Sequence, residues 1–193
     1  MNGRPEEHNA LREQGAGSDH TETNCNDTIS PDSPWRNIPD ELRAADRWVL
    51  WEAVQKDNGK TDKKPLGAKD LRPCNAYAPE NWSSFEGAVK AWHGNPVAAA
   101  GIGFALGDGW AGVDLDDCID PDTAGMHPEA LAVVAELNTY TEVSPSGRGV
   151  KMFLHANVDG LVGNKTKDTP WGGSAEIYWS DRFITVAGDH WEP

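Results

Sequence analysis

The 193-residue sequence lacks any apolar run that approaches the roughly 18 residues of a membrane-spanning helix. Its N-terminus also lacks the apolar core of a signal peptide. Both absences predict a soluble, cytoplasmic protein with no membrane partner. Cysteine is scarce, because only Cys25, Cys74 and Cys118 are present, an odd number without the close spacing of metal ligands. We therefore expect no disulfide framework, which suits a reducing compartment.

Basic residues are also few, with 17 lysines and arginines against 31 acids and a net charge of −14. Nucleic-acid-binding proteins usually carry a basic surface, because neutralised phosphates supply most of the non-specific affinity. Residues 1–34 hold seven acids and two arginines, a net charge of −5, which leaves −9 for the remainder. This balance predicts weak DNA binding by the chain alone, and it suits an enzyme that concentrates carboxylates around divalent cations.

Two regions differ in composition. Residues 1–34 are polar, acidic and rich in glycine, asparagine and serine, with almost no apolar periodicity, so they are predicted to form a disordered tail. From about Trp35 the apolar content rises, and residues 35–193 are predicted to form one domain.

The first half of this domain combines a strand, a long loop and a helix. Residues 47–54 are aromatic and β-branched, which predicts a strand, and residues 56–79 follow as a loop with a basic cluster. Ser83-x-x-Glu86 is a capping box before apolar residues at helical spacing, and Gly94 should end that helix.

The second half is predicted to be mainly strands. Residues 101–106 and 112–116 are two strands joined by a turn at 107–109, and a helix begins at Pro128. Further strands are predicted at 150–155, 175–179 and 182–187, with a tight hairpin between the last two. The pattern predicts an α+β domain whose mostly antiparallel sheet is covered by two helices.

Asp114-Leu115-Asp116 is the first candidate for chemistry. Residues i and i+2 of a strand point to the same face, so both carboxylates should project together, opposite Leu115. Adjacent carboxylates repel each other unless a cation lies between them, and Mg²⁺ or Mn²⁺ suits oxygen ligands. The alternative is a strand end with solvated aspartates. An EF-hand is excluded, because Cys118 and Ile119 occupy positions that it needs for a ligand and a glycine.

Residues 141–151 are the second candidate, since small hydroxyl residues, two glycines and two cations precede a strand. Gly147 and Gly149 would let backbone amides approach a triphosphate, Ser146 could donate a hydrogen bond, and Arg148 and Lys151 could supply positive charge. The alternative is an ordinary turn between elements. A Walker A loop is excluded, because the Gly-Lys-Ser/Thr ending is missing.

Glu176 is the third candidate and lies in an otherwise apolar strand. Taken alone, it could face solvent by strand alternation. Together, a pair of acids, a phosphate-type loop and a third acid are what two-metal phosphoryl chemistry requires.

The order of these motifs resembles the phage and plasmid primase-polymerases of the archaeo-eukaryotic primase superfamily. The segments that carry the resemblance are 101–104, 113–118, 140–149, 176–178 and 182–188, with 48–51, 64–65 and 82–85 similar as well. The match runs from about Trp48 to Gly188. Several motifs in the same order are more specific than any one of them.

The resemblance implies an RRM-like, mostly antiparallel sheet that carries the site, with helices on one face and a small accessory αβ unit beside it. Asp114, Asp116 and Glu176 would bind two divalent cations, Mg²⁺ or Mn²⁺, as the catalytic carboxylates. The implied nucleotide-binding residues are Ser146, Gly147, Arg148, Gly149, Lys151 and Arg182. Lys63 and Lys64 are candidates for weaker contact with the template.

One position departs from the family pattern, because Lys151 stands where the second motif normally has a histidine. Lysine keeps a positive charge near phosphate, though as a flexible point charge. His155 would share the face of Lys151 by strand alternation, but it is too distant to replace the missing histidine.

The predicted function is template-directed nucleotidyl transfer, as a DNA primase or polymerase in the replication of a phage or mobile element. Its partners would be nucleoside triphosphates, a single-stranded DNA template and a helicase domain or subunit. One alternative is a catalytically silent module that binds nucleotide or single-stranded DNA. Another is a metal-dependent nuclease, which needs no triphosphate cradle.

Overall fold

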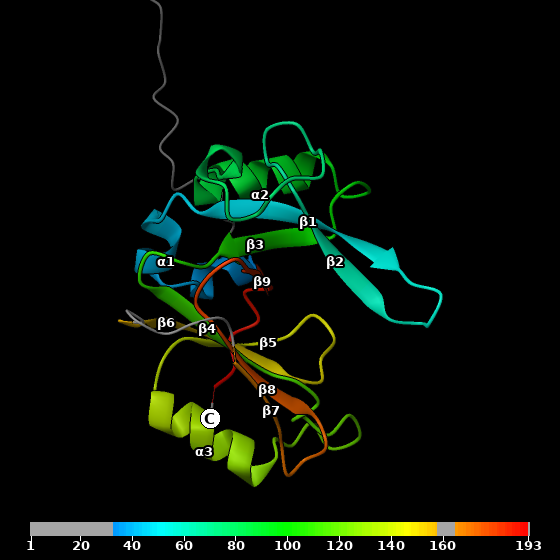
Figure 1. Cartoon of the computed structure of the whole chain (residues 1–193), viewed down its shortest axis with the longest axis vertical. Coiled ribbons are helices and arrows are strands. Elements are labelled where there is room, and N and C mark those ends of the chain that lie inside the picture. The colour runs from blue at the N-terminus through cyan, green and yellow to red at the C-terminus, as the bar shows by residue number, and fades with distance from the viewer. Residues whose placement is uncertain (1–32, 158–164, 193) are drawn as a thin grey trace, which may run out of the picture.

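The computed structural model describes residues 33–157 and 165–192. The tail predicted at residues 1–34 lies outside these residues, apart from Ser33 and Pro34. The elements form two sheets, shown one above the other in Figure 1. The helical segments are η2 (Pro34–Asn37), α1 (Asp40–Ala44), η3 (Pro79–Asn81), α2 (Phe85–Gly94) and α3 (Pro128–Leu137). No helix in these two ranges is long and apolar enough to cross a membrane.

The first sheet has the strand order β2-β1-β3-β9, and every neighbouring pair is antiparallel. Its strands are β1 (Trp48–Gln55), β2 (Thr61–Leu66), β3 (Gly101–Ala105) and β9 (Phe183–Val186). Helix α2 lies over this sheet (Figure 1) and buries Phe85 against Trp48. Trp48 also meets Phe104 edge to face at 5.2 Å, so aromatic packing explains why the start of β1 is buried.

The second sheet has the strand order β5-β6-β4-β8-β7, again antiparallel throughout. Its strands are β4 (Trp110–Leu115), β5 (Thr141–Val143), β6 (Val150–His155), β7 (Lys165–Asp168) and β8 (Ser174–Tyr178). Helix α3 contributes Ala130 and Val134 to a core that also contains Val113 and Leu115 of β4. Because Val113 and Leu115 point into this core, Asp114 points to the opposite face of the sheet.

The predicted α+β class and antiparallel pairing are confirmed, with the strands divided between two sheets. The strand predicted at 47–54, the helix end at Gly94 and the helix start at Pro128 are also confirmed. Three strands were not predicted: β2, which lies in the expected loop at 56–79, and the short strands β5 and β7. Ser84 rather than Ser83 caps α2, because its Oγ accepts a hydrogen bond from Gly87 N at 3.1 Å.

The turn predicted at 107–109 is confirmed, but the tight hairpin predicted at 180–181 is wrong, because each of these turns carries the chain from one sheet to the other. The turn at 107–109 joins β3 to β4, and all three of its residues have positive φ. The turn at 180–181 joins β8 to β9, with Asp181 at φ 52°. Arg47 fixes the first crossing by donating hydrogen bonds to Ala105 O at 2.8 Å and to Leu106 O at 3.2 Å.

Candidate metal and nucleotide site

The candidate metal site is centred on Asp114 in β4, the middle strand of the second sheet. On one side Asp114 lies opposite Lys151 of β6, and on the other it lies opposite Glu176 of β8. Directly opposite residues of neighbouring strands share a face, so the three charged side chains form a row across the sheet. Asp116 follows the end of β4 and is held there by its N–H, which donates to Ser174 O at 2.8 Å.

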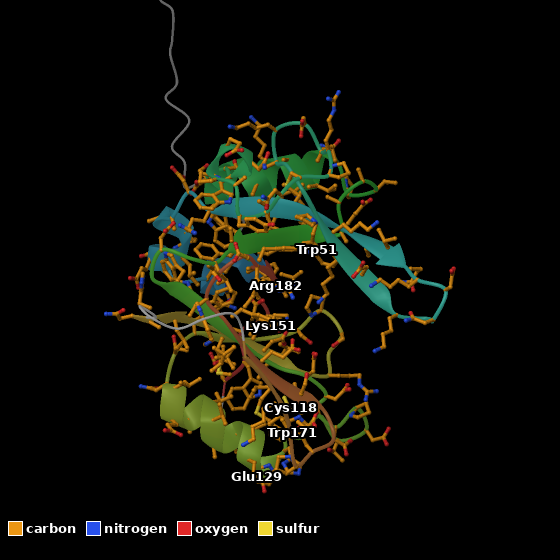
Figure 2. All side chains as sticks on the ribbon, in the orientation of Figure 1. Trp51, Cys118, Glu129, Lys151, Trp171 and Arg182 are labelled. Carbon is orange, nitrogen blue, oxygen red and sulfur yellow. The ribbon has the colours of Figure 1, made fainter. Side chains whose placement is uncertain are left out.

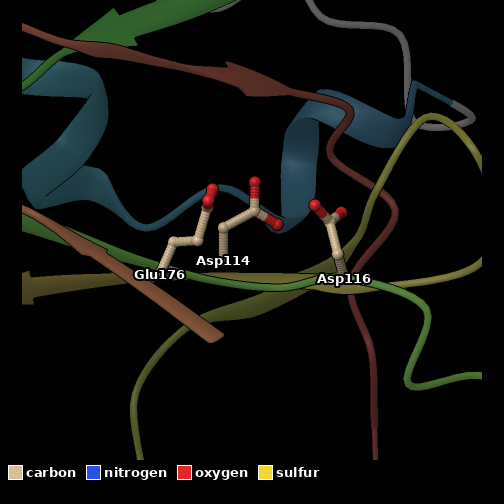
Figure 3. Close-up of side chains that lie close together, drawn as sticks. All are labelled: Asp114, Asp116 and Glu176. Atoms are coloured by element: carbon tan, nitrogen blue, oxygen red, sulfur yellow. The ribbon is translucent and has the colours of Figure 1, made fainter. Parts of the chain in front are cut away.

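The three carboxylates come together as the sequence predicts. Asp114, Asp116 and Glu176 each offer an oxygen, and these ligand atoms all lie within 4.8 Å of one another. Figure 3 shows the three side chains directed to the same side of the sheet. Three acids at this spacing repel one another, and a bound divalent cation would relieve that repulsion.

Asp114 carries the clearest sign that a cation fits here. Its Oδ2 accepts a hydrogen bond from the Lys151 ammonium, and both side chains are largely buried. Its Oδ1 is buried and has no hydrogen-bond partner among the residues that the structure describes. A buried carboxylate oxygen without a donor is costly, and a hard cation is the partner that such an oxygen prefers.

The surroundings of Asp116 and Tyr178 raise the pKa of both side chains. Partial loss of hydration and then repulsion from Asp114 raise the pKa of Asp116 above its usual value. The Tyr178 hydroxyl donates a hydrogen bond to Glu176 Oε2. Burial and then this bond raise the pKa of Tyr178, so it stays protonated and can hold the carboxylate of Glu176 in place.

A cleft of about 760 Å³ opens over this row, between the two sheets. Lys151 and Arg182 both lie between the sheets in Figure 2. The Arg182 guanidinium lies over the Tyr178 ring, 5.5 Å from its centroid. The residues that line the cleft come from β2, the following loop, the charged row and the β8–β9 region: Thr61, Asp62, Lys63, Pro65, Cys74, Asn75, Ala76, Tyr77, Asp114, Lys151, Glu176, Tyr178, Asp181, Arg182, Phe183, Ile184 and Thr185.

Lys63 reaches the cleft from the first sheet. Loss of hydration and then repulsion from Lys151 lower the pKa of Lys63, whereas attraction to Asp114 and Asp116 opposes this shift. Lys63 Nζ also lies 5.9 Å from the centre of the Trp51 ring. Its neighbour Lys64 is exposed, as Lys63 is, but it does not line the cleft. The structure therefore separates two lysines that the sequence groups together.

Residues 146–149 of the predicted phosphate loop lie between β5 and β6 and are not among the residues that line the cleft. The Ser146 and Ser144 hydroxyls share a hydrogen bond of 2.8 Å, and Arg148 Nε donates to Asp117 Oδ1 at 2.7 Å. The backbone of Gly149 packs on the end of β4, where a Cβ would meet Leu115 O. Of the nucleotide-binding residues predicted from sequence, Lys151 and Arg182 line the cleft, and the Lys151 ammonium contacts Asp114.

Sequence reasoning assigned no role to Glu142, which is fully buried on β5 opposite Lys151. Its carboxylate accepts hydrogen bonds from Ala187 N at 2.9 Å and Gly188 N at 3.0 Å, and from the Tyr140 hydroxyl at 3.2 Å. Burial raises the pKa of Glu142 to about 7, although these hydrogen bonds and Lys151 act in the opposite direction. The sequence signal that could have drawn attention to Glu142 is its position as an acid between Thr141 and Val143, in a stretch of β-forming residues.

This shift predicts a pH-dependent stability. Because the folded-state pKa of Glu142 is raised, its contribution is fully present below about pH 4.5 and is lost as the pH rises through about 7. The free energy of unfolding should fall by roughly 2 kcal/mol between pH 5 and pH 8 from this group, as measured by urea denaturation. Glu142→Gln should flatten the profile, whereas Glu136→Gln, at an exposed position of α3, should keep the wild-type slope. An unchanged slope in Glu142→Gln would assign the effect to other groups.

Comparison with known proteins gives one informative similarity. No family model matches the chain. A protein named DNA Primase-polymerase from Nitratiruptor phage NrS-1 is 27% identical over 149 residues, which cover 74% of this chain and 19% of the phage protein. The chain therefore spans about a fifth of the length of this relative. The similarity supports a relationship to primase-polymerases at the level of the family.

Proposed function

We propose that the chain is a catalytic domain of the archaeo-eukaryotic primase type, which adds nucleotides to a 3′-hydroxyl or starts a primer on single-stranded DNA. The biological setting would be the replication of a phage or mobile element, with a helicase as a partner. The observation that carries the proposal is the convergence of Asp114, Asp116 and Glu176 beside a cleft that Asp114 and Glu176 line together with cationic side chains. The similarity to a phage primase-polymerase supports it independently.

The donor set defines the chemistry that the site could support. Divalent cations held by the three carboxylates would activate the attacking hydroxyl and neutralise charge on the triphosphate and the leaving pyrophosphate. Lys63 and Arg182 line the same cleft and would bind the triphosphate through charge-assisted hydrogen bonds. The cleft volume lies within the range of about 300–1,000 Å³ that is common for small-molecule sites.

One observation favours a second candidate, a silent module that binds nucleotide without transferring it. The Lys151 ammonium already contacts a catalytic carboxylate, Asp114, and could keep the site from its active arrangement. A nuclease could use the same three acids, but it would not require Lys63 and Arg182, cationic residues that line the cleft beside them.

Three measurements separate these functions: nucleotide binding, DNA cleavage and primer extension. The chain should bind a nucleoside triphosphate in the presence of Mn²⁺, as measured by calorimetry, and it should not cleave single-stranded DNA. DNA cleavage without nucleotide binding would identify a nuclease. Nucleotide binding without primer extension would identify the silent module, and the absence of both nucleotide binding and primer extension would contradict the proposal. Parallel titrations with ribo- and deoxynucleotides, and with Mg²⁺ in place of Mn²⁺, would show which type of nucleotide and which metal the chain prefers. The sequence predicts neither preference.

Lys63 and Lys64 offer a matched pair of substitutions within one strand. Lys63→Ala should weaken the binding of a nucleoside triphosphate by about ten- to a hundredfold, because a charge-assisted contact contributes roughly 1.5–3 kcal/mol. Lys64→Ala should leave nucleotide affinity near that of the wild type, because Lys64 does not line the cleft. Equal losses in the two variants would mean that long-range charge, and not a contact from Lys63, attracts the nucleotide.

A further inference from the structure

The cluster of carboxylates already contains a cation of its own, the Lys151 ammonium. Lys151 is 3% exposed, and its Nζ donates to Asp114 Oδ2. The two side chains form an ion pair in which 4% of the lysine and 15% of the aspartate side chain remain exposed. Breaking such a pair leaves an uncompensated buried charge, so the contact should persist when solvent enters the cleft.

A second acid flanks Lys151 on its other side. Glu142 of β5 lies directly opposite Lys151, and its charge interacts with that of the lysine. Lys151 therefore stands between Glu142 and Asp114 in one row across three neighbouring strands. This arrangement gives the ammonium a fixed place rather than a free range of positions in the cleft.

The contact limits what Asp114 can offer to metals. In two-metal sites the cations lie about 3.5–4 Å apart, a spacing that a shared carboxylate spans with one oxygen on each cation. Here Lys151 occupies Oδ2, whereas Oδ1 is buried and meets no hydrogen-bond partner within residues 33–157 and 165–192. Asp114 thus has one oxygen available to a divalent cation and not two.

The balance of charge in the cluster also indicates a single divalent cation. Asp114, Asp116, Glu176 and the flanking Glu142 carry four negative charges when all are ionised, and Lys151 and Lys63 compensate two of them. A single divalent cation balances the remaining two. A second divalent cation would leave an excess of positive charge until a triphosphate arrived.

We propose that in the nucleotide-free chain Lys151 takes the place of one of the two divalent cations, so that the cluster binds a single Mg²⁺ or Mn²⁺ through Asp114 Oδ1, Asp116 and Glu176. A second cation then enters only with the triphosphate of an incoming nucleotide. This inference rests on the proposed metal centre, and it assigns Lys151 to the cations rather than to direct contact with phosphate.

The test is a titration of the chain with Mn²⁺ alone, in which electron paramagnetic resonance measures the free ion. Wild type should bind one Mn²⁺ per chain. Lys151→Met should bind two, the first at least about tenfold more tightly than in wild type, because a competing charge has been removed. Lys90→Met, which removes an exposed lysine from α2, should match wild type.

Two further variants distinguish a failure of the role proposed for Lys151 from a failure of the proposed metal centre. Circular dichroism checks that each variant folds. If Lys151→Met does not fold, the double variant Lys151→Met/Glu142→Gln replaces it, because it removes the buried lysine together with the buried acid that faces it. The double variant should show the same gain in Mn²⁺ binding. Two equivalent Mn²⁺ ions in wild type, or unchanged binding in a folded variant without Lys151, would overturn the role of Lys151 alone. Wild-type Mn²⁺ binding by Asp116→Ala would instead contradict the metal centre, and with it the proposed function.

Discussion

Asp116→Ala should lower the rate of nucleotide addition by about three orders of magnitude or more while the protein remains folded. Asp116 is exposed and follows the end of β4, so its side chain contributes little to the core. Its carboxylate is one of the three oxygen donors within 4.8 Å of one another. Loss of a cation ligand should remove several kcal/mol of transition-state stabilisation, and about 1.4 kcal/mol corresponds to tenfold in rate.

Asp117 provides the matched control for this prediction. It is the next residue in the chain and is also exposed, but its carboxylate pairs with Arg148 at 2.7 Å and is not part of the cluster formed by Asp114, Asp116 and Glu176. Asp117→Ala should therefore retain most of the wild-type rate. Near wild-type primer extension by a folded Asp116→Ala variant would show that the chemistry does not use this carboxylate.

Gly173→Ala should reduce both stability and activity, because the backbone of Asp116 lies against Gly173. A Cβ at this position would meet Asp116 O and would lie 2.9 Å from the carbonyl carbon of the same residue. Backbone atoms cannot move aside as a flexible side chain can, so either the β7–β8 loop or the end of β4 must shift. We expect a loss of about 1–3 kcal/mol in the free energy of unfolding. A displacement of Asp116 by about 1 Å should lower the rate of nucleotide addition about a hundredfold.

Gly94 is the control for the glycine substitution. It ends α2, and a Cβ there would have no atom of the described part of the chain within 4 Å. Gly94→Ala should leave activity unchanged and should stabilise the helix slightly, by up to about 1 kcal/mol. Chemical denaturation and primer extension measure the two effects. If Gly173→Ala were as stable and as active as Gly94→Ala, the close packing of the β7–β8 loop on Asp116 would not position the site.

The sequence predicts the shared face of Asp114 and Asp116 well, because its signal is local. Strand alternation places Asp114 and Asp116 on one face, and an apolar helix at 128–137 covers the opposite face through Val113 and Leu115. The presence of Glu176 beside Asp114 depends on which strands pair. No local pattern contains that information, and only the order of motifs shared with primase-polymerases suggested it.

Other features could not be read from the sequence for definite physical reasons. Strand β2 contains Lys63, Lys64 and Pro65, which local propensities assign to a loop, and its pairing with β1 overrides them. Short turns rich in glycine and aspartate usually close hairpins, yet those at 107–109 and 180–181 connect different sheets. The contact of Lys151 with Asp114, and the burial of Glu142, follow from the order of β5, β6 and β4 in the sheet.

Template-directed primer extension tests the central claim most directly. Wild type would be mixed with a labelled primer on a single-stranded DNA template, each nucleotide in turn, and Mg²⁺ or Mn²⁺, with Asp114→Asn as the inactive control. The proposed function predicts metal-dependent lengthening of the primer by the nucleotide complementary to the next template base, with a change of nucleotide when that base is changed. Failure of a folded wild-type chain to extend the primer with either metal and any nucleotide, or equal extension by Asp114→Asn, would contradict it.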